Sequence, residues 1–293
     1  FLGSIQSNGG RGGEIVITSA ADLISLGGHS PALVAQSIGG GGGATGSASK
    51  FARLGTVEGR GDTSAADLTI NHTGNISTTG IYSSGVLAQS IGGGGGLVGV
   101  VSGAVSMGSV QSFETQSSSA GDIAVNISGR IITTGDHSPA LVAQSIGGGG
   151  GYVGEVDGSA QFGSSNSSGR QDAGIVSFIN SGSVQTTGAF SPLINVQSIG
   201  GGGGRAGDIG TSLNLGAVNL LGASAQGGNV TVRNTAPLLI STGLSSPALL
   251  AQSIGGGGGA SAEVTGNVTM GASGTGIASA GTVDVTNVSL IRT

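Results

Sequence analysis

Short runs in which apolar and polar residues alternate recur along the whole chain, separated by Gly, Asn, Asp and Ser. Alternation with period two in β-branched residues is typical of short β-strands, because successive side chains of a strand point to opposite faces. The alternating pairs that open each copy are Ile15/Ile17, Leu68/Ile70, Ile123/Val125, Val176/Phe178 and, offset by one position, Val230/Val232. The pattern predicts an all-β protein and no helices.

The strands belong to a tandem repeat of about 53–55 residues, whose copies align without gaps around one glutamine. Each of these glutamines is followed by Ser-Ile and five glycines, is preceded nine residues earlier by a glycine, and is followed 18 residues later by a bulky residue and a glycine, as in Leu54-Gly55. The five anchors are Gln36, Gln89, Gln144, Gln197 and Gln252. Residues 1–293 are therefore predicted to form a single repeat array, with a partial copy at the C-terminal end.

The residues before each glutamine indicate which face of its strand is buried. Position 33 is aliphatic in every copy, position 35 is small, and position 37 is always serine, so this face is predicted to point inward. Position 34 varies from Val34 to Asn195. The face that carries the glutamine is therefore expected to be accessible or to pack against a neighbouring layer.

Stacking of such copies predicts a repetitive parallel β-solenoid, similar to a β-helix, in the form of an elongated rod. In the first copy, apolar landmarks stand at Ile15, Leu33 and Leu54, before the next copy begins at Leu68. We interpret these landmarks as three strand-turn coils per repeat, which gives roughly 16 coils and a rod of roughly 75 Å at about 4.8 Å per coil. Two larger coils per repeat are the alternative.

Glycine supplies 64 of the 293 residues, which is about three times its usual share. The uniform runs of five predict backbone sites too tight for a Cβ, with glycines at positive φ where the chain turns a corner. Flexible tethers are the alternative, although tethers would tolerate drift in length. The runs lack the lysine and helix of a phosphate-binding loop and the aspartates of calcium-binding repeats.

Charge and composition exclude several classes of function. The net charge is −5 and the basic residues form no cluster, so we expect no nucleic-acid partner. There is no cysteine for disulfides or thiolate metal sites, and no apolar stretch reaches the roughly 18 residues of a membrane span. The chain begins in mid-pattern without an initiator Met, which favours a fragment whose targeting and anchoring parts lie elsewhere.

Catalytic chemistry is hard to find in the sequence. His29 and His137 occupy one slot before Ser-Pro, which we align with Ser83, Phe190 and Ser245, and they are interpreted as turn residues, while His72 stands alone. No close pair of carboxylates recurs on one strand face, and sugar-stacking aromatics are scarce. We therefore predict no enzyme, no cofactor and no metal, and give a polysaccharide-cleaving β-helix little weight.

One tripeptide, Arg60-Gly61-Asp62, resembles integrin-recognition sequences. It lies in the segment Thr56–Asp67, which changes in sequence and length between copies and is expected to be an exposed loop, as is Ser109–Asp122. Composition alone would produce such a tripeptide in roughly one chain in twenty, so coincidence is the favoured reading until exposure is shown. Arg60, Gly61 and Asp62 are retained as a possible adhesive loop.

The string Ser-Pro-Ala-Leu-Val-Ala-Gln-Ser-Ile followed by five glycines, at 30–43 and 138–151, resembles the Gly-rich repeats of large bacterial autotransporter passengers. The resemblance covers all five copies and implies an extracellular, cell-surface β-solenoid associated with the outer membrane, commonly an adhesin. It carries over no functional residue, and the C-terminal membrane barrel of that family is not in this sequence. The expected function is an adhesive stalk or passenger that binds a ligand on a host or neighbouring cell, without inserting into the membrane itself. The alternative is a self-assembling extracellular fibre of identical chains.

Overall fold

The computed structural model describes residues 10–55, 61–109, 117–165 and 168–293, and these form 27 strands and no helix. The strands make five sheets in which every pairing between strands is parallel. Neighbours in a sheet come from successive copies, so that Ile15 pairs with Leu68 and Gln89 with Gln144. The chain is therefore the parallel β-solenoid that its sequence predicts.

Each of the five full copies contributes one strand to each sheet, the partial copy adds β26 and β27 to the first two, and the sheets are numbered here in the order in which the chain reaches them. The first sheet holds β1 (Ile15–Ser19), β6 (Leu68–His72), β11 (Ile123–Ile127), β16 (Val176–Asn180), β21 (Val230–Asn234) and β26 (Val283–Asn287). The second sheet holds β2 (Leu23–Ser25), β7 (Ile76–Thr78), β12 (Ile131–Thr133), β17 (Val184–Thr186), β22 (Leu238–Ser241) and β27 (Leu290–Arg292).

The other three sheets have five strands each and surround the glycine runs. The third sheet holds β3 (Leu33–Ile38), β8 (Val86–Ile91), β13 (Leu141–Ile146), β18 (Ile194–Ile199) and β23 (Leu249–Ile254). The fourth sheet holds β4 (Gly42–Ala48), β9 (Gly95–Val101), β14 (Gly150–Val156), β19 (Gly203–Ala206) and β24 (Gly258–Ser261). The fifth sheet holds β5 (Phe51–Leu54), β10 (Ala104–Met107), β15 (Ala160–Phe162), β20 (Leu213–Leu215) and β25 (Val268–Met270).

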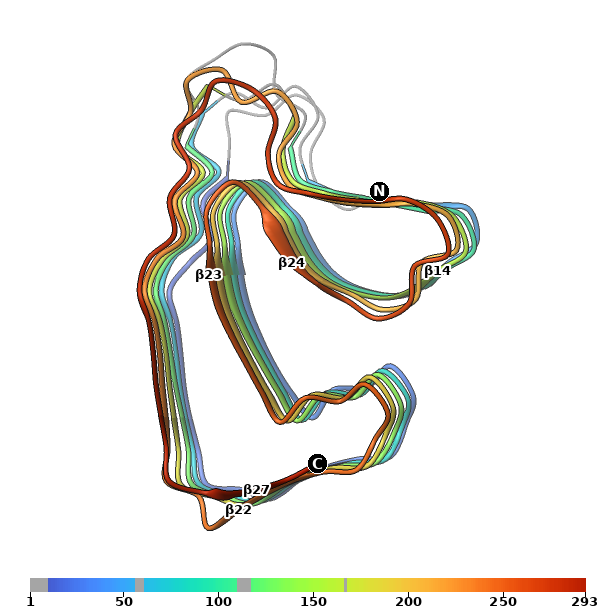
Figure 1. Ribbon diagram of the computed structural model, residues 1–293, viewed down its shortest axis with the longest axis vertical. Helices are drawn as coiled ribbons and strands as arrows, with labels where there is room; N and C mark the ends of the chain where they lie inside the picture. The colour runs from blue at the N-terminus through green and yellow to red at the C-terminus, as the bar shows by residue number, and fades with distance from the viewer. Residues whose placement is uncertain (1–9, 56–60, 110–116, 166–167) are drawn as a thin grey trace.

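The number of coils predicted from the sequence is wrong, because one repeat makes one large coil. Ile15, Leu33 and Leu54 lie in three different sheets of the same coil, and only Leu68 stacks on Ile15. Both the three-coil and the two-coil interpretations fail for this reason. The sheets are at most six strands deep, so this chain spans about 24 Å along the stack at about 4.8 Å per strand, not 75 Å. The stack direction is the shortest axis of the molecule, along which Figure 1 is viewed.

Seen along the stack, the superimposed coils outline two lobes (Figure 1). The first lobe is enclosed by the first three sheets, whose inward side chains, such as Leu68, Ile76 and Val86, share one apolar core. The second lobe lies between the fourth and fifth sheets and has its own core, which includes Val98 and Val105. Burial of these two cores is the main source of stability, since each coil can bury its apolar face only against its neighbours.

The pentaglycine runs form the sharp turn between the third and fourth sheets. Gly40 and Gly41 have φ of 78° and 88°, a region that side chains rarely adopt. A Cβ on Gly42 would lie 1.9 Å from the carbonyl oxygen of Gly95 in the next coil. The sequence-based prediction of tight, turning backbone is confirmed, and the flexible-tether alternative is wrong.

Serine on the inward face closes the first lobe at its corner. The Ser37 hydroxyl accepts a hydrogen bond from the Ala66 backbone N–H at 3.0 Å, and the Ser90 hydroxyl donates to the Ala66 carbonyl at 2.9 Å. The prediction that position 37 points inward is therefore confirmed. The glutamine face is buried as well, since every residue of β8, β13 and β18 is buried, and it packs against the neighbouring layer.

Candidate functional site

The outer face of the third sheet faces the fourth sheet between the two lobes (Figure 1), and we call the space between these sheets, which side chains partly fill and which contains a pocket, the cleft. A ladder of glutamine side chains fills its deep end. Gln36 Nε2 donates to Gln89 Oε1 at 2.8 Å, and the same bond is repeated at 2.9, 2.7 and 2.6 Å through Gln144, Gln197 and Gln252. Leu87, Val142 and Tyr152 pack together farther out. Every buried amide on the third sheet except that of Asn195 thereby finds a partner.

Four rings stack along the stack axis at the mouth of the cleft. The ring centroids of His29 and Tyr82 are 5.0 Å apart, those of Tyr82 and His137 are 4.7 Å apart, and those of His137 and Phe190 are 5.1 Å apart. The planes are within 18° of parallel, so the rings form a continuous column. We call His29, Tyr82, His137 and Phe190 the ring ladder.

The ring ladder corrects one alignment made from the sequence. Tyr82, not Ser83, occupies the slot of His29 and His137, while Ser83 is the counterpart of Ser30 and Ser138. The slot residues have φ between 52° and 55°, as does Ser245 in the fifth copy. A left-handed conformation costs a residue with a Cβ about 1–2 kcal/mol, and these residues adopt it in every coil.

Glycines on the opposite wall make room for the rings. A Cβ on Gly99 would lie 3.0 Å from His29 Nδ1, and a Cβ on Gly154 would lie 3.0 Å from Tyr82 Cδ1. Both glycines stand ten residues after the anchor glutamine of their copy. A bulky residue seven positions before the glutamine, combined with a glycine ten positions after it, is the sequence signal that could have revealed the ladder.

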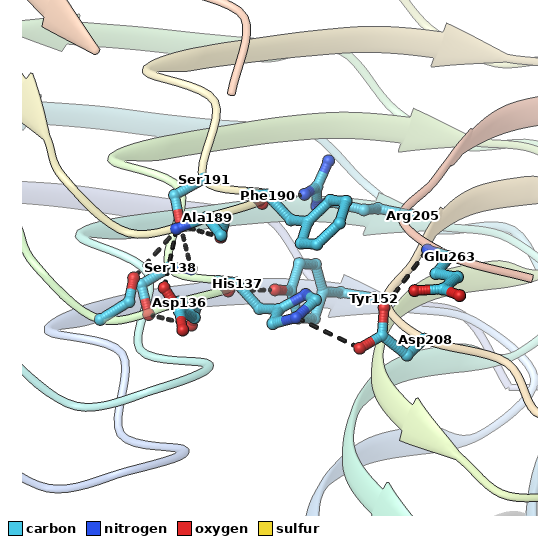
Figure 2. Close-up of polar contacts among 11 residues, drawn as sticks. Asp136, His137, Ser138, Tyr152, Ala189, Phe190, Ser191, Arg205, Asp208 and Glu263 are labelled. Carbon is cyan, nitrogen blue, oxygen red and sulfur yellow. Dashed lines mark hydrogen bonds and ion pairs between the residues drawn. The ribbon is translucent and has the colours of Figure 1, made fainter. Parts of the chain in front are cut away.

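Side chains from the second lobe reach across the cleft to the ladder (Figure 2). The Tyr152 hydroxyl donates to the His137 carbonyl oxygen at 2.7 Å, and Arg205 donates to the Phe190 carbonyl oxygen at 2.6 Å. His137 Nε2 lies 3.3 Å from Asp208 Oδ2. These contacts hold the two lobes together in the third and fourth coils.

Burial sets the protonation of the ladder. It lowers the pKa of His137 below the usual value of 6.5, against the opposing attraction of Asp208, so the imidazole is neutral at pH 7 although Nε2 lies beside that carboxylate. Burial likewise raises the pKa of Tyr82 far above its usual value, and that of Tyr152 above its usual value. The ring ladder is therefore uncharged at neutral pH.

A row of carboxylates runs along the second lobe beside the ladder. Glu155, Asp208 and Glu263 stand at equivalent positions of three successive coils and line one shallow pocket with Asp157. The sequence was searched only for a close pair of carboxylates on one strand, and this row, whose members come one from each coil more than 50 positions apart, was not foreseen. Within the described residues, no group of three or more His, Asp or Glu side chains is placed to hold a metal ion.

The possible adhesive tripeptide is described only in part. Arg60 lies outside the described residues, while Gly61 is exposed with φ of 101°. Asp62 is half-buried, pairs with Arg11 at 2.7 Å and accepts a hydrogen bond from the Ser64 backbone N–H at 2.9 Å. Burial acts to raise the pKa of Asp62, but the bonds from Ser64 and Arg11 outweigh it and lower that pKa. The carboxylate thus has partners within its own chain.

The remaining histidine, His72, is buried in the first sheet, and neither ring nitrogen has a hydrogen-bond partner among the described residues. Burial lowers its pKa. Among the residues that the structure describes, no helix has the length and apolar character needed to cross a bilayer. Comparison with family models, with curated proteins and with solved structures gave no match to this chain.

Proposed function

We propose that this chain is a rigid, adhesive segment of a surface-exposed, autotransporter-like passenger. The solenoid is the scaffold, and the variable segments between coils contact a ligand on a host or neighbouring cell. The observation that carries the proposal is the contrast between a framework in strict register and joining segments that differ from copy to copy.

The variable segments join the fifth sheet to the first. Between their flanking strands they contain 13, 15, 13, 14 and 12 residues in successive copies, while the strands on either side remain paired. Their described parts lie together at the top of Figure 1, outside the two cores. Pairing of the flanking strands is the same in every copy although these segments differ in sequence and length, which is the property required of a scaffold that displays contact residues.

Attachment of bacteria that display the chain tests this proposal. A non-adherent strain that carries residues 1–293 on its surface should bind cultured epithelial cells above a display-only control. Replacing residues 56–60 and 110–116 by Gly-Ser sequence of equal length should reduce attachment while the circular dichroism of the purified protein is unchanged. Attachment equal to the display-only control would contradict the proposal.

The tripeptide is tested separately by two matched variants. Asp62→Ala removes the acidic residue of the tripeptide, whereas Arg11→Ala removes only its partner in the ion pair. If integrin-type recognition contributes, attachment falls in Asp62→Ala and is retained in Arg11→Ala. Equal attachment of both variants and the parent assigns adhesion to other residues of the variable segments.

A self-assembling fibre is the second candidate, favoured by the uniform parallel register of the coils, which would let a coil of one chain stack on a coil of another. The outermost strands β26 and β27 expose Val285, Leu290 and Ile291, among other apolar residues. Unpaired edges with apolar side chains can pair with another chain. Negative-stain microscopy of the purified chain distinguishes the two, because a fibre subunit should form regular filaments whereas an adhesive segment should remain as single particles.

A further inference from the structure

The cleft contains a pocket of about 120 Å³ behind the first two rings of the ladder. Its walls are the rings of His29, Tyr82 and Tyr152, the apolar side chains of Ala44 and Leu97, and the backbone around Gly99. The volume is several times the roughly 30 Å³ that a water molecule occupies in the liquid and close to the roughly 150 Å³ at which an engineered apolar cavity admits benzene. The pocket is therefore large enough for one six-membered ring.

The pocket exists because one position changes size along the stack. The residue eight positions after the anchor glutamine is Tyr152 in the third coil and Arg205 in the fourth, and both side chains cross the cleft. The corresponding residues in the first two coils are Ala44, which pairs with Leu97, and Leu97, which pairs in turn with Tyr152. Because Ala44 is small, the space that the Tyr152 ring fills in the third coil is unfilled in the first coil.

The presence of Ala44 and Leu97, where later coils have Tyr152 and Arg205, also leaves backbone hydrogen-bond acceptors without donors. The carbonyl oxygens of His137 and Phe190 accept bonds from Tyr152 and Arg205. Within the described residues, the equivalent carbonyl oxygens of His29 and Tyr82 accept no such bond, since neither alanine nor leucine can donate. The buried Nδ1 of His29 also has no partner among these residues. A buried polar atom without a partner is unfavourable, and a ligand that supplies the missing donor would be favoured.

The charges near the pocket indicate whether a ligand there should resemble the neutral side chain of Tyr152 or the cationic side chain of Arg205. The residues of the first two coils that correspond to Glu155 are Ser47 and Val100, so these coils contribute no carboxylate at that position. A cation enclosed there would find no carboxylate of its own coils to pair with, and Glu155, whose charge reaches His29, belongs to the third coil. A neutral hydroxyl group needs no carboxylate partner, so the pocket favours a ligand that resembles Tyr152.

We propose that this pocket binds a neutral ring that carries a hydroxyl group, a phenol. The ring occupies the place that Tyr152 fills two coils later, packed on Leu97 and Ala44 behind the ring ladder. The hydroxyl donates to the carbonyl oxygen of His29, as the Tyr152 hydroxyl donates to that of His137. The phenol is either a free small molecule or the tyrosyl side chain of a partner.

Titration of the full chain with p-cresol, followed by the methyl resonances of Leu97 and Val98, tests the proposal. We expect saturable shifts with a Kd on the order of 1 mM, in the range that a ligand of eight non-hydrogen atoms can reach. Toluene lacks the hydroxyl and should bind about fivefold more weakly, the effect of one hydrogen bond. The peptide Gly-Tyr-Gly, titrated in the same way, distinguishes a tyrosyl side chain from a free phenol.

Ala44→Tyr should fill the pocket and abolish binding, with a melting temperature equal to or above that of the parent. Ala260→Tyr is the matched control, because it places the same side chain at the equivalent position of the fifth coil, outside the pocket, and should leave binding unchanged. Leu97→Tyr provides a second blocking variant should Ala44→Tyr fail to fold. Absence of p-cresol binding at 10-fold the expected Kd, equal binding of toluene, tighter binding of methylguanidinium, or undiminished binding to a folded blocking variant would each overturn the proposal.

Discussion

Gly149, the third glycine of its run, lies directly against Gly108 of the preceding copy, so that a Cβ on Gly149 would be 2.3 Å from the Gly108 Cα. The same distance recurs between Gly94 and Gly55 and between Gly202 and Gly163. The glycine runs and the glycine that follows each bulky residue are therefore two sides of one backbone contact. This contact brings the turn between the third and fourth sheets against the end of the fifth.

Gly149→Ala should destabilise the chain by about 2–5 kcal/mol, from strain at its φ of 98° and from overpacking against Gly108. Urea unfolding followed by circular dichroism measures the loss. Gly13→Ala is the control, because a Cβ there meets no atom within 4 Å, and its effect should stay within about 0.5 kcal/mol. Equal effects of the two substitutions would show that the close contact does not limit this site.

Gln144→Leu should destabilise the chain by about 2–4 kcal/mol. It leaves Gln89 Nε2 without an acceptor and Gln197 Oε1 without a donor, both in the buried end of the cleft. Gln36→Leu, at the end of the ladder, leaves only Gln89 Oε1 without a partner and should cost about half as much. Denaturant unfolding midpoints of the two variants measure the loss of stability. A larger loss for Gln36→Leu than for Gln144→Leu would contradict a cooperative amide ladder.

Stability should fall as the pH drops below about 6.5, through the buried histidines. The pKa of His137 is lowered by burial in the native state, so the unfolded chain binds a proton that the native chain does not, and acid favours unfolding. The stabilisation is complete above pH 6.5 and declines toward the native pKa, by at most about 1.4 kcal/mol per pH unit for one histidine. His137→Phe, which places the Phe190 side chain type in this slot, should reduce the slope of melting temperature against pH. An unchanged slope would assign the acid sensitivity to other groups.

Ser245→Phe should extend the ring ladder by one member and stabilise the chain. Ser245 already has the backbone conformation of Phe190, with φ of 52° at both residues, and its side chain is exposed. Aromatic stacking contributes about 0.5–1.5 kcal/mol beyond the apolar area that it buries. Ser245→Leu controls for that area, so differential scanning calorimetry should place Ser245→Phe above Ser245→Leu. The reverse order would argue against a stacking contribution.

The sequence predicted the strands, the inward serine and the rigid glycine turns, because each of these depends on neighbours along the chain or on exact recurrence. It failed on the number of coils. Alternation shows that Ile15 and Leu33 are in strands. It does not show whether strands 18 residues apart stack as successive coils or belong to different sheets of the same coil. The repeat period answered that question, since Leu68 is the first residue equivalent to Ile15 and the residue with which it pairs.

The cleft and the ring ladder could not be predicted in the same way. They form where two lobes of one coil face each other, and no local pattern shows that Gly99 lies beneath the ring of His29. The misplacement of Tyr82 by one position also hid the second ring of the column. The offset of Val230 in the fifth copy, by contrast, has a simple origin. One extra residue lies between Asn234 and Leu239, compared with their partners Asn180 and Val184, and Val176 still pairs with Val230.

The hydrogen bonds of the glutamine ladder all run in one direction, so the two ends of the stack are chemically different. Every Nε2–H from Gln36 to Gln197 points toward the C-terminal end, so within the described residues the ladder ends on the acceptor of Gln36 and on the donor of Gln252. Two stacks that met through like ends would set donor against donor or acceptor against acceptor in a dry environment. Any continuation of the array is thereby restricted to one polarity, and a new coil can only be added with the orientation of the coil beneath it.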